Sequence, residues 1–353
     1  MYFKKAIYTL THWEAWDWRI KYIPLIPLWI WYCIKSRSIW FFTASNPSLI
    51  FGGLDGVSKK DMYTQLPANL YPKSIFVSKN LLFEEVENLF VANSFNYPVA
   101  VKPEVGRIDF MFRKIETINN LKFYHEKMPV NYILQDYINY PVEVSVFYYR
   151  FPGENKGTIT GFIKKESLCV IGDGRSSLLE LITNSPRAFL RIEEIKLKHH
   201  NKLNDIIPKA EVFHLSHALN LSRGAKLVNL DHEKDEKLLK VFDELSHYTK
   251  HFYYGRYDIK CASIEELKKG ENFFILEYNG SGAEPHHVYG NGNTLVTACK
   301  ILLQHWDILY KISRCNYKKG IQYWKLSEGW KFFKEANKHV SMLKQLDAKF
   351  PVS

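Results

Sequence analysis

The sequence lacks the features of several protein classes. Its 353 residues contain no low-complexity tract, no internal repeat and no Gly/Ser-rich linker, so no long segment is unable to bury apolar surface. The five cysteines show no Cys-x-x-Cys spacing, and no histidines cluster at zinc-ligand intervals. These absences argue against a disulfide framework or a zinc site and predict reduced thiols in a cytoplasm. With 46% apolar and 24% charged residues, the chain should fold as a globular protein.

The formal net charge is +11. Such a charge concentrates anions near the surface and suits nucleic acid, phosphate-rich ligands or an anionic membrane. Lysine and arginine are spread along the chain, however, and no RNA- or DNA-binding signature accompanies them. We therefore expect no nucleic-acid partner. The sequence sets no oligomeric state.

The amino-terminal segment is unusual because it holds six of the nine tryptophans before residue 42. Its apolar run over residues 22–34 has only 13 residues and contains Pro24 and Pro27, whereas a spanning helix needs about 20 apolar residues. The run also begins too late for a signal peptide, and no small-residue cleavage site follows it. Two alternatives stay open. The segment packs on the protein's own core, or it contacts an anionic membrane or an acylated substrate, peripherally on the inner face of the membrane.

The membrane alternative depends on aromatic rings beside cations, because such residues settle at the headgroup boundary. The residues concerned are Trp29, Trp31, Trp40, Lys35 and Arg37.

Strands and helices alternate irregularly along the rest of the chain. Turn residues between Asn46 and Gly56 mark a boundary before a helical stretch that opens at Ser58. Apolar content or period-two alternation predicts strands over 97–103, 132–137, 142–148, 255–259 and 272–279. Helical periodicity predicts helices over 79–93, 234–250 and 293–313. Because there is no strict βαβ rhythm, the sequence predicts an α+β fold.

Three oxygen-bearing side chains near predicted strand ends could form a metal site. Glu277 and Asn279 lie two residues apart on one strand, so their side chains leave the same face. Asp258 lies on the preceding strand, two residues after Arg256, and a hairpin pairing of the strands would bring all four together. Carboxylate and amide oxygens are hard ligands that suit Mg²⁺. Ordinary surface carboxylates are the alternative for this pattern taken alone.

Further residues precede this pattern in a defined order. Lys59 is followed by Lys102 at the end of Pro-Val-Ala-Val-Lys-Pro, and Glu143 comes later. Between them lies a segment formed by Gln135, Asp136, Tyr137 and Ile138. With the Gly-Arg-x-Asp and Glu-x-Asn segments, this order resembles the ATP-grasp superfamily, and D-alanine–D-alanine ligase in particular, over roughly residues 57–290. The resemblance implies two α+β subdomains that clasp ATP.

The resemblance also implies roles for these residues. Lys59 and Lys102 would contact nucleotide phosphates, residues 135–138 would be the hinge that holds adenine through backbone groups, and Glu143 would bind ribose hydroxyls. Arg256 would stabilise the tetrahedral intermediate. The implied ligands of Mg²⁺, with two ions expected, are Asp258, Glu277 and Asn279.

A second motif over residues 170–182 contains Gly-Asp-Gly-Arg-Ser and is similar to a segment of cyanophycin synthetases and related amino-acid ligases. A plain turn into a helix capped by Ser176 or Ser177 is the alternative. Just before the motif, Lys164 and Lys165 fall where such ligases place another phosphate-contacting lysine. We favour Lys165 as a catalytic and nucleotide-contacting residue.

Candidate substrate contacts lie at and after the metal segment. Residues 276–287 resemble a group of bacterial ATP-grasp proteins, and the positions within them assigned to the substrate are Gly282, Glu284, His286 and His287. One histidine could act as a base for the amine or hold a carboxylate, with a structural role as the alternative. Joint metal binding is disfavoured because adjacent residues on an extended segment point apart. Arg223 is a candidate carboxylate clamp or a solvated turn arginine.

The resemblance implies an ATP- and Mg²⁺-dependent ligase that activates a small-molecule carboxylate as an acyl phosphate and joins it to an amine. The expected division is a Trp-rich segment over 1–56, a first ATP-grasp subdomain over 57–140, a second over 141–292 and a helical region over 293–353.

The sequence departs from the family pattern at two points. About 55 residues precede Lys59 where D-alanine–D-alanine ligase has a Rossmann-like domain, so D-alanine itself is not the expected substrate. Residues 104–111, which should cover the phosphates, contain a single glycine, and Arg107 is the expected substitute for missing backbone contacts. Two alternatives therefore stay open: a ligase for a membrane-associated or acylated substrate, and a nucleotide-regulated membrane-surface binding module without activity.

Overall fold

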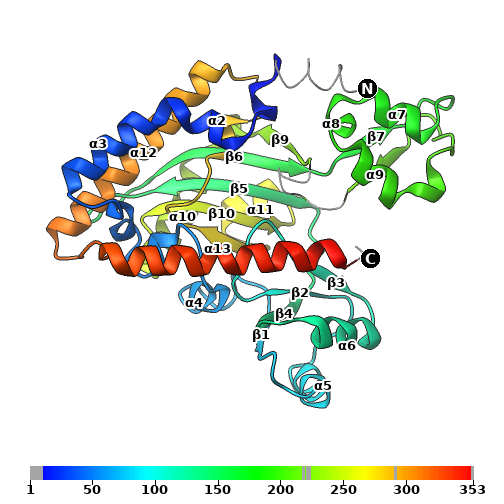
Figure 1. Ribbon diagram of the computed structural model, residues 1–353, viewed down its shortest axis with the longest axis horizontal. Coiled ribbons are helices and arrows are strands. Elements are labelled where there is room, and N and C mark those ends of the chain that lie inside the picture. Colours follow the sequence, from blue (N-terminus) through cyan, green and yellow to red (C-terminus); the bar gives the residue numbers. More distant parts are fainter. Residues whose placement is uncertain (1–10, 217–218, 220–223, 290–291, 351–353) are drawn as a thin grey trace.

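Two antiparallel sheets organise the protein (Figure 1). The computed structural model describes residues 11–216, 219, 224–289 and 292–350, and the structural statements below concern these residues. The first sheet has the strand order β1-β4-β2-β3. Its strands are β1 (Ser74–Val77), β2 (Val99–Pro103), β3 (Arg113–Ile115) and β4 (Tyr132–Asp136). Helices α5 (Phe83–Ala92) and α6 (Ile118–Lys127) share one apolar core with these strands.

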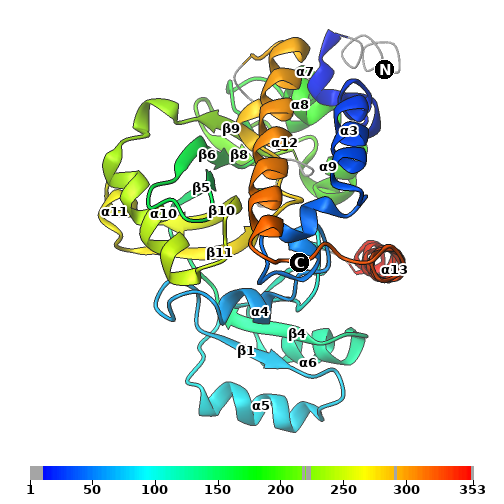
Figure 2. The ribbon, with the colours of Figure 1, turned by 90° about the vertical axis from the view of Figure 1, so that its left-hand side faces the viewer.

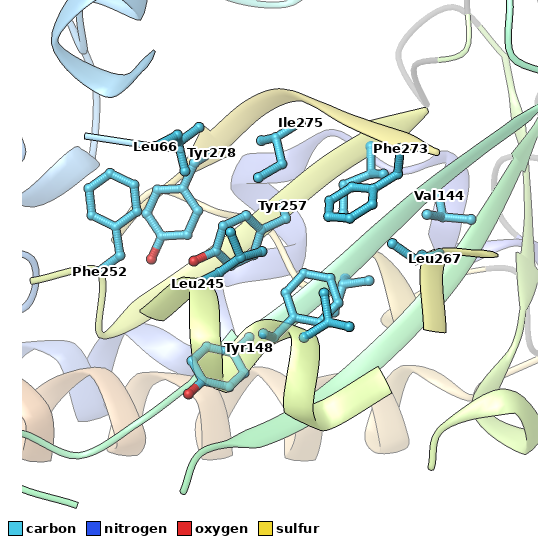
Figure 3. Packing of buried hydrophobic residues seen from close by; sticks show 14 of the residues in the cluster. Leu66, Val144, Tyr148, Leu245, Phe252, Tyr257, Leu267, Phe273, Ile275 and Tyr278 are labelled. Atoms are coloured by element: carbon cyan, nitrogen blue, oxygen red, sulfur yellow. The ribbon is translucent and has the colours of Figure 1, made fainter. Parts of the chain in front are cut away.

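The second sheet has the strand order β11-β10-β5-β6-β9. Its strands are β5 (Val142–Tyr149), β6 (Thr158–Glu166), β9 (Lys226–Asn229), β10 (Tyr254–Cys261) and β11 (Phe273–Asn279). Helices α10 (Glu236–Thr249) and α11 (Ile264–Lys269) cover one face, where Leu245, Tyr257 and Tyr278 pack together (Figure 3). Because successive side chains of a strand point to opposite faces, the polar residues between these core positions are directed to the other face.

A small lobe projects from the second sheet at the upper right of Figure 1. It consists of strands β7 (Cys169–Ile171) and β8 (Val212–His214) with helices α7 (Leu178–Asn184), α8 (Pro186–Phe189) and α9 (Ile192–Lys198) around their own apolar cluster. Of the two serines expected to cap a helix here, Ser177 is the N-cap: its hydroxyl accepts from the Glu180 amide. Asp173 accepts backbone bonds from Arg175 and Ser176, which hold its pKa at about 2. The Gly-Asp-Gly motif is thus a well-ordered turn into a helix.

The amino-terminal segment is helical and packs against the carboxy-terminal region. It contains α2 (Trp18–Tyr22), α3 (Ile26–Ser36) and the 3-10 turns Trp13–Ala15, Ile23–Leu25, Phe41–Ala44 and Ile50–Gly53. Along α12 (Leu295–Lys318), Tyr32 stacks on Tyr310 with ring centroids 4.2 Å apart, and Trp29 meets Trp306 at 4.8 Å. The packing alternative is therefore confirmed for this face. Among the described helices, none is long and apolar enough to cross a membrane.

Helix α13 (Leu326–Lys349) runs across the front of the molecule in Figure 1 and contacts the amino-terminal segment and the first sheet. At its start, Trp330 lies 5.4 Å from Trp40 of the amino-terminal segment. At its end, Leu343 enters the core of the first sheet, and the Asp347 carboxylate accepts from the Met111 amide and the Arg113 guanidinium, both at 2.9 Å. Helix α13 therefore ties the loop before β3 to the rest of the protein.

The α+β prediction is confirmed, and each predicted strand and helix has a counterpart within a few residues. The stretch after Ser58 forms the short helix α4 (Lys59–Tyr63), and the closing helix extends beyond 313 to Lys318 as α12. Strands β1, β3, β6, β7, β8 and β9 were not predicted. The division of the chain at residues 56, 140 and 292 remains a prediction.

We predict that Asp347→Asn destabilises the protein by about 3 kcal/mol, because it leaves the charge of Arg113 buried without its partner. Both side chains are only 10–11% exposed. Urea unfolding measures the change. The matched control is Glu116→Gln just after β3, which breaks the exposed Lys114–Glu116 pair and should cost less than about 0.5 kcal/mol. Equal costs for the two variants would show that the buried pair is not important for stability.

Candidate active site

The predicted hairpin places the candidate metal ligands together. Strands β10 and β11 pair with Asp258 opposite Glu277 and Arg256 opposite Asn279. On its other side, Asp258 lies opposite Ser145 of β5. Lys165 on β6 lies opposite Glu143 on β5, so neighbouring strands supply all of these groups. The period-two argument from the sequence correctly predicted that Glu277 and Asn279 share a face.

Asp258 is the centre of a buried network of charges. Its carboxylate accepts from the Arg256 guanidinium at 3.0 and 3.1 Å and from the Ser145 hydroxyl at 2.5 Å. The Lys165 ammonium lies 3.1 Å away and also 3.2 Å from Glu143. Burial by itself would raise the pKa of Asp258, but Arg256 and Lys165 outweigh it and hold that pKa well below its usual range. The carboxylate is therefore ionised at neutral pH.

The two cations keep their charge for the same reason. Burial would lower the pKa of Lys165, but the carboxylates of Asp258 and Glu143 raise it above its ordinary value. Burial also opposes the charge of Arg256, and Asp258 again raises the pKa. A fixed positive charge thus lies on each side of Asp258.

Asn279 and two lysines surround Glu277. The Asn279 amide donates to Asp258 at 3.1 Å and to Glu277 at 3.4 Å. The Lys59 ammonium lies 3.5 Å from the Glu277 carboxylate. Lys102 donates to the Leu276 carbonyl at 3.3 Å and to the Tyr63 hydroxyl at 3.1 Å, and burial lowers its pKa although Glu277 opposes this. Both predicted phosphate lysines thus lie beside β11.

The donor set fits a magnesium ion by its chemistry. Asp258, Glu277 and Asn279 offer two carboxylates and one amide oxygen, and Mg²⁺ in proteins is usually held by one or two carboxylates together with phosphate oxygens and water. Among the described residues, no group of three or more His, Cys, Asp and Glu side chains could hold a metal. A metal at this site would therefore depend on Asn279 and on nonprotein oxygens.

The segment predicted to be the adenine hinge leaves the first sheet at the end of β4. Gln135 is buried on β4, whereas Asp136 is partly exposed, 3.7 Å from Lys73. The Ile138 carbonyl accepts from Lys260 at 3.1 Å, and the same ammonium lies over the ring of Tyr137. Lys260 thus connects the segment to β10.

His286 and His287 point in different directions, as expected for adjacent residues, although they lie in a 3-10 turn (His286–Val288) and not on an extended segment. Nδ1 of His286 lies 3.5 Å from the Ser145 hydroxyl, within the charge network. Burial and the nearby Arg256 lower the pKa of His286 well below its usual value. His287 instead packs against Gly161, where an added Cβ would lie 2.1 Å from its Nδ1.

Two further predicted residues have partners outside the charge network, and a third is not described. Arg107 is exposed and pairs with Asp55 at 3.2 Å, so its predicted contact with phosphate remains a prediction. Gly282 packs so closely on the Leu54 backbone that a Cβ would lie 2.2 Å from the carbonyl oxygen, which gives this glycine a packing role. Arg223 lies outside the described residues.

No family model matches the chain. No curated protein matches it either. Several solved ligase structures are similar to parts of the chain. D-alanine–D-alanine ligase from Bacillus anthracis is 16% identical over 74% of this chain and 69% of its own, with a TM-score of 0.39. A bifunctional glutathione synthetase from Pasteurella multocida is 14% identical over 67% of this chain, with a TM-score of 0.40, and this chain spans only 34% of its length.

The ATP-grasp ligase PsnB, solved with a minimal precursor, is 11% identical over 70% of this chain and 60% of its own, with a TM-score of 0.37.

Two residues of the amino-terminal segment form a wall beside the network that had no signal in the sequence. Arg256 donates to the Glu284 carbonyl at 2.9 Å, and the Glu284 carboxylate accepts from the Tyr289 hydroxyl. Trp13 stacks on Tyr289 at 5.5 Å, and the Lys21 ammonium lies 4.8 Å from the centre of that ring. Burial lowers the pKa of Lys21. No local pattern could have indicated this contact, because it joins residues more than 250 positions apart.

We predict a pH-dependent loss of stability from His287. Burial lowers its pKa to about 4, whereas an unfolded histidine has a pKa of about 6.5. Below pH 6.5 the unfolded chain binds the extra proton, so this residue reduces stability as the pH falls toward 4, by about 1.4 kcal/mol per pH unit. The difference in unfolding free energy between wild type and His287→Asn should therefore change by about 2 kcal/mol between pH 7 and pH 5.

Urea unfolding at a series of pH values measures this difference, which cancels contributions common to both proteins, such as those of His286 and Glu143. The matched control is His232→Asn, because that side chain is 72% exposed. A His287→Asn curve parallel to wild type would show that His287 does not titrate as predicted.

Proposed function

We propose that the protein is an ATP-dependent carboxylate–amine ligase that forms an acyl phosphate and releases ADP. The proposal rests on one observation: lysines from α4 and β2 lie beside the carboxylates and the arginine of strands β10 and β11. Lys59 on α4 and Lys102 on β2 lie beside β11, which together with β10 carries Glu277, Asp258 and Arg256. This is the order and placement expected if phosphates lie between the two sheets.

The chemistry requires activation because a carboxylate is a poor acyl donor. A carboxylate oxygen would attack the γ-phosphorus of ATP, breaking its bond to the β,γ-bridging oxygen and releasing ADP. The amine nitrogen would then attack the acyl carbon of the acyl phosphate. The C–N bond forms, the C–O bond to phosphate breaks, and the amine loses a proton. ATP cleavage thereby drives formation of the amide.

Positioning and fixed charge would supply most of the catalysis, as in other phosphoryl transfers. Lys59, Lys102 and Lys165 would hold the phosphates in line. Arg256 would direct one N–H toward the oxyanion that develops on the acyl carbon, because its guanidinium is already fixed by Asp258 and the Glu284 carbonyl. A preorganised donor of this kind is commonly worth about 3 kcal/mol.

Asp258, Glu277 and Asn279 would hold Mg²⁺, with two ions proposed. When bound, the metal supplies positive charge that neutralises the phosphate oxygens during transfer. The ionised state of Asp258 is favourable for this role, since a protonated carboxyl would be a poor ligand.

His286 would accept the proton that the amine loses. Its low pKa keeps the imidazole neutral beside Arg256 and Lys165, so His286 cannot act as a charged clamp for a carboxylate and would hold the proton only in passing. Residues 135–138 and Glu143 would hold the adenosine. Glu284 and the wall formed by Trp13, Lys21 and Tyr289 would border the substrates, which we propose to be a small carboxylic acid and an amine.

The direct test is a screen of acid and amine pools for phosphate release from ATP with Mg²⁺ present. Release that requires both an acid and an amine supports the ligase. Nucleotide binding without release from any pair would instead indicate a nucleotide-regulated binding module. The matched control protein in each well is Glu277→Gln.

We predict Mg²⁺-dependent binding of ATP. Glu277→Gln keeps the size of the side chain but removes one charged ligand, so it should keep the fold and lower phosphate release by at least about 100-fold. Calorimetry with and without Mg²⁺ measures binding, and circular dichroism checks the fold. Absence of any ATP affinity in the presence of Mg²⁺ would refute the proposal.

We predict that Arg256→Lys binds ATP as wild type does but turns over about 10² to 10³ times more slowly. Lysine keeps the charge but lacks the planar fork that contacts Asp258 and the oxyanion at the same time. Single-turnover phosphate release with an active acid–amine pair measures the effect. Turnover close to wild type would remove Arg256 from the transition state.

A further inference from the structure

The outer face of the amino-terminal helices is apolar and exposed. Six large side chains on this face are between 46% and 64% exposed: Ile20, Ile23, Ile26, Ile30, Trp31 and Ile34. The isoleucines recur every three or four residues, which places them on one side of a helical run. Exposed apolar side chains that gather in one patch are characteristic of interaction sites. We call these six residues the isoleucine face.

The opposite side of the same helical run packs on the rest of the protein. Leu25 and Tyr32 are buried, and Trp29 meets Trp306 of α12. These positions also recur at helical spacing, so the segment has two apolar sides, of which only one is needed to attach it to the protein. In Figure 2, α3 lies outside α12 at the right of the molecule, and the exposed fractions of the six side chains show that the described residues do not cover the isoleucine face.

The charged residues within the segment that carries the isoleucine face are basic. Between residues 18 and 54 the sequence contains no Asp or Glu, whereas Arg19, Lys35 and Arg37 are exposed there. Among the described residues, Lys35 and Arg37 form no ion pair, although the Lys35 ammonium lies 5.6 Å from the centre of the Tyr310 ring. Arg19 pairs with Asp17 at the start of α2. A second copy of this chain would bring like charges together on such a face. An anionic surface would instead complement it.

We propose that the isoleucine face binds the surface of an anionic lipid bilayer. From Ile20 to Ile34 the run is about 21 Å long at 1.5 Å per residue, too short to span but suited to lie flat with its apolar side in the headgroup boundary. Lys35 and Arg37 at one end and Arg19 at the other lie where they can meet lipid phosphates. The proposal does not depend on the ligase activity.

In the structure, the residues available for membrane contact differ from those that the sequence suggested. Of the tryptophans that suggested it in the sequence, Trp29 and Trp40 face inward and pack on the core, and only Trp31 is exposed. The apolar contact is assigned mainly to isoleucines. The same segment carries Lys21, whose ammonium lies over Tyr289 beside the candidate active site, so the site lies close behind the proposed membrane face.

The test is co-sedimentation of the full chain, without nucleotide, with phosphatidylcholine vesicles containing about one-third phosphatidylserine. Wild type should bind at low salt and release at about 0.5 M salt, where screening shortens the Debye length. The variant Ile23→Ser/Ile30→Ser/Ile34→Ser should bind at least about tenfold more weakly. Lys35→Gln/Arg37→Gln should lose most of the preference for anionic over neutral vesicles.

The matched control is Val91→Ser/Leu197→Ser/Val212→Ser, which removes three apolar side chains that are 48% to 80% exposed on α5, α9 and β8 and should bind like wild type. Equal binding of the isoleucine variant and wild type would overturn the proposal, as would wild type that ignores anionic vesicles. A wild-type dimer in sedimentation equilibrium that the isoleucine variant loses would assign the face to a second copy instead. Because the assay contains no ATP, failure of the ligase proposal would not affect its result.

Discussion

The buried carboxylate of Asp258 between Arg256 and Lys165 is the interaction on which the candidate site depends. A charge removed from water is tolerated only when partners surround it, and here the partners come from neighbouring strands of one sheet. The apolar side of that sheet packs on α10 and α11, which fixes the strands and therefore the charges. The core packs on one face of this sheet and the charges of the site lie on the other, so the packing that stabilises the core also positions the charges.

The rest of the site comes from the first sheet and from α4, so its geometry depends on how these parts are held against the second sheet. Helix α13 contributes to this through Asp347, which binds Arg113 and the Met111 amide, and through His339, whose Nε2 donates to the Val105 carbonyl at 2.8 Å. These contacts bracket the loop expected to cover phosphates. This loop has a single glycine and so cannot form the tight turns of a glycine-rich loop. Its contacts with α13 would fix its backbone instead.

The amino-terminal segment joins three regions of the protein. Its inner side packs on α12, Trp13 and Lys21 border the candidate site, and the isoleucine face is turned outward. Membrane attachment through this face would hold the site near the lipid surface, which would favour an acid or amine that is itself amphiphilic. This consequence rests on both proposals together.

The sequence by itself determined the features that depend on local spacing. Period-two alternation predicted that Glu277 and Asn279 share a strand face, and helical periodicity predicted α5, α10 and most of α12, because both signals lie within a few consecutive residues. Only the tertiary structure decided that Arg107 pairs with Asp55, that Gly282 packs on Leu54, and that the isoleucines rather than most of the tryptophans of the amino-terminal run face outward. Each of these outcomes depends on which distant segment occupies the neighbouring space, and a run that is apolar on all sides contains no local signal of which side will be covered.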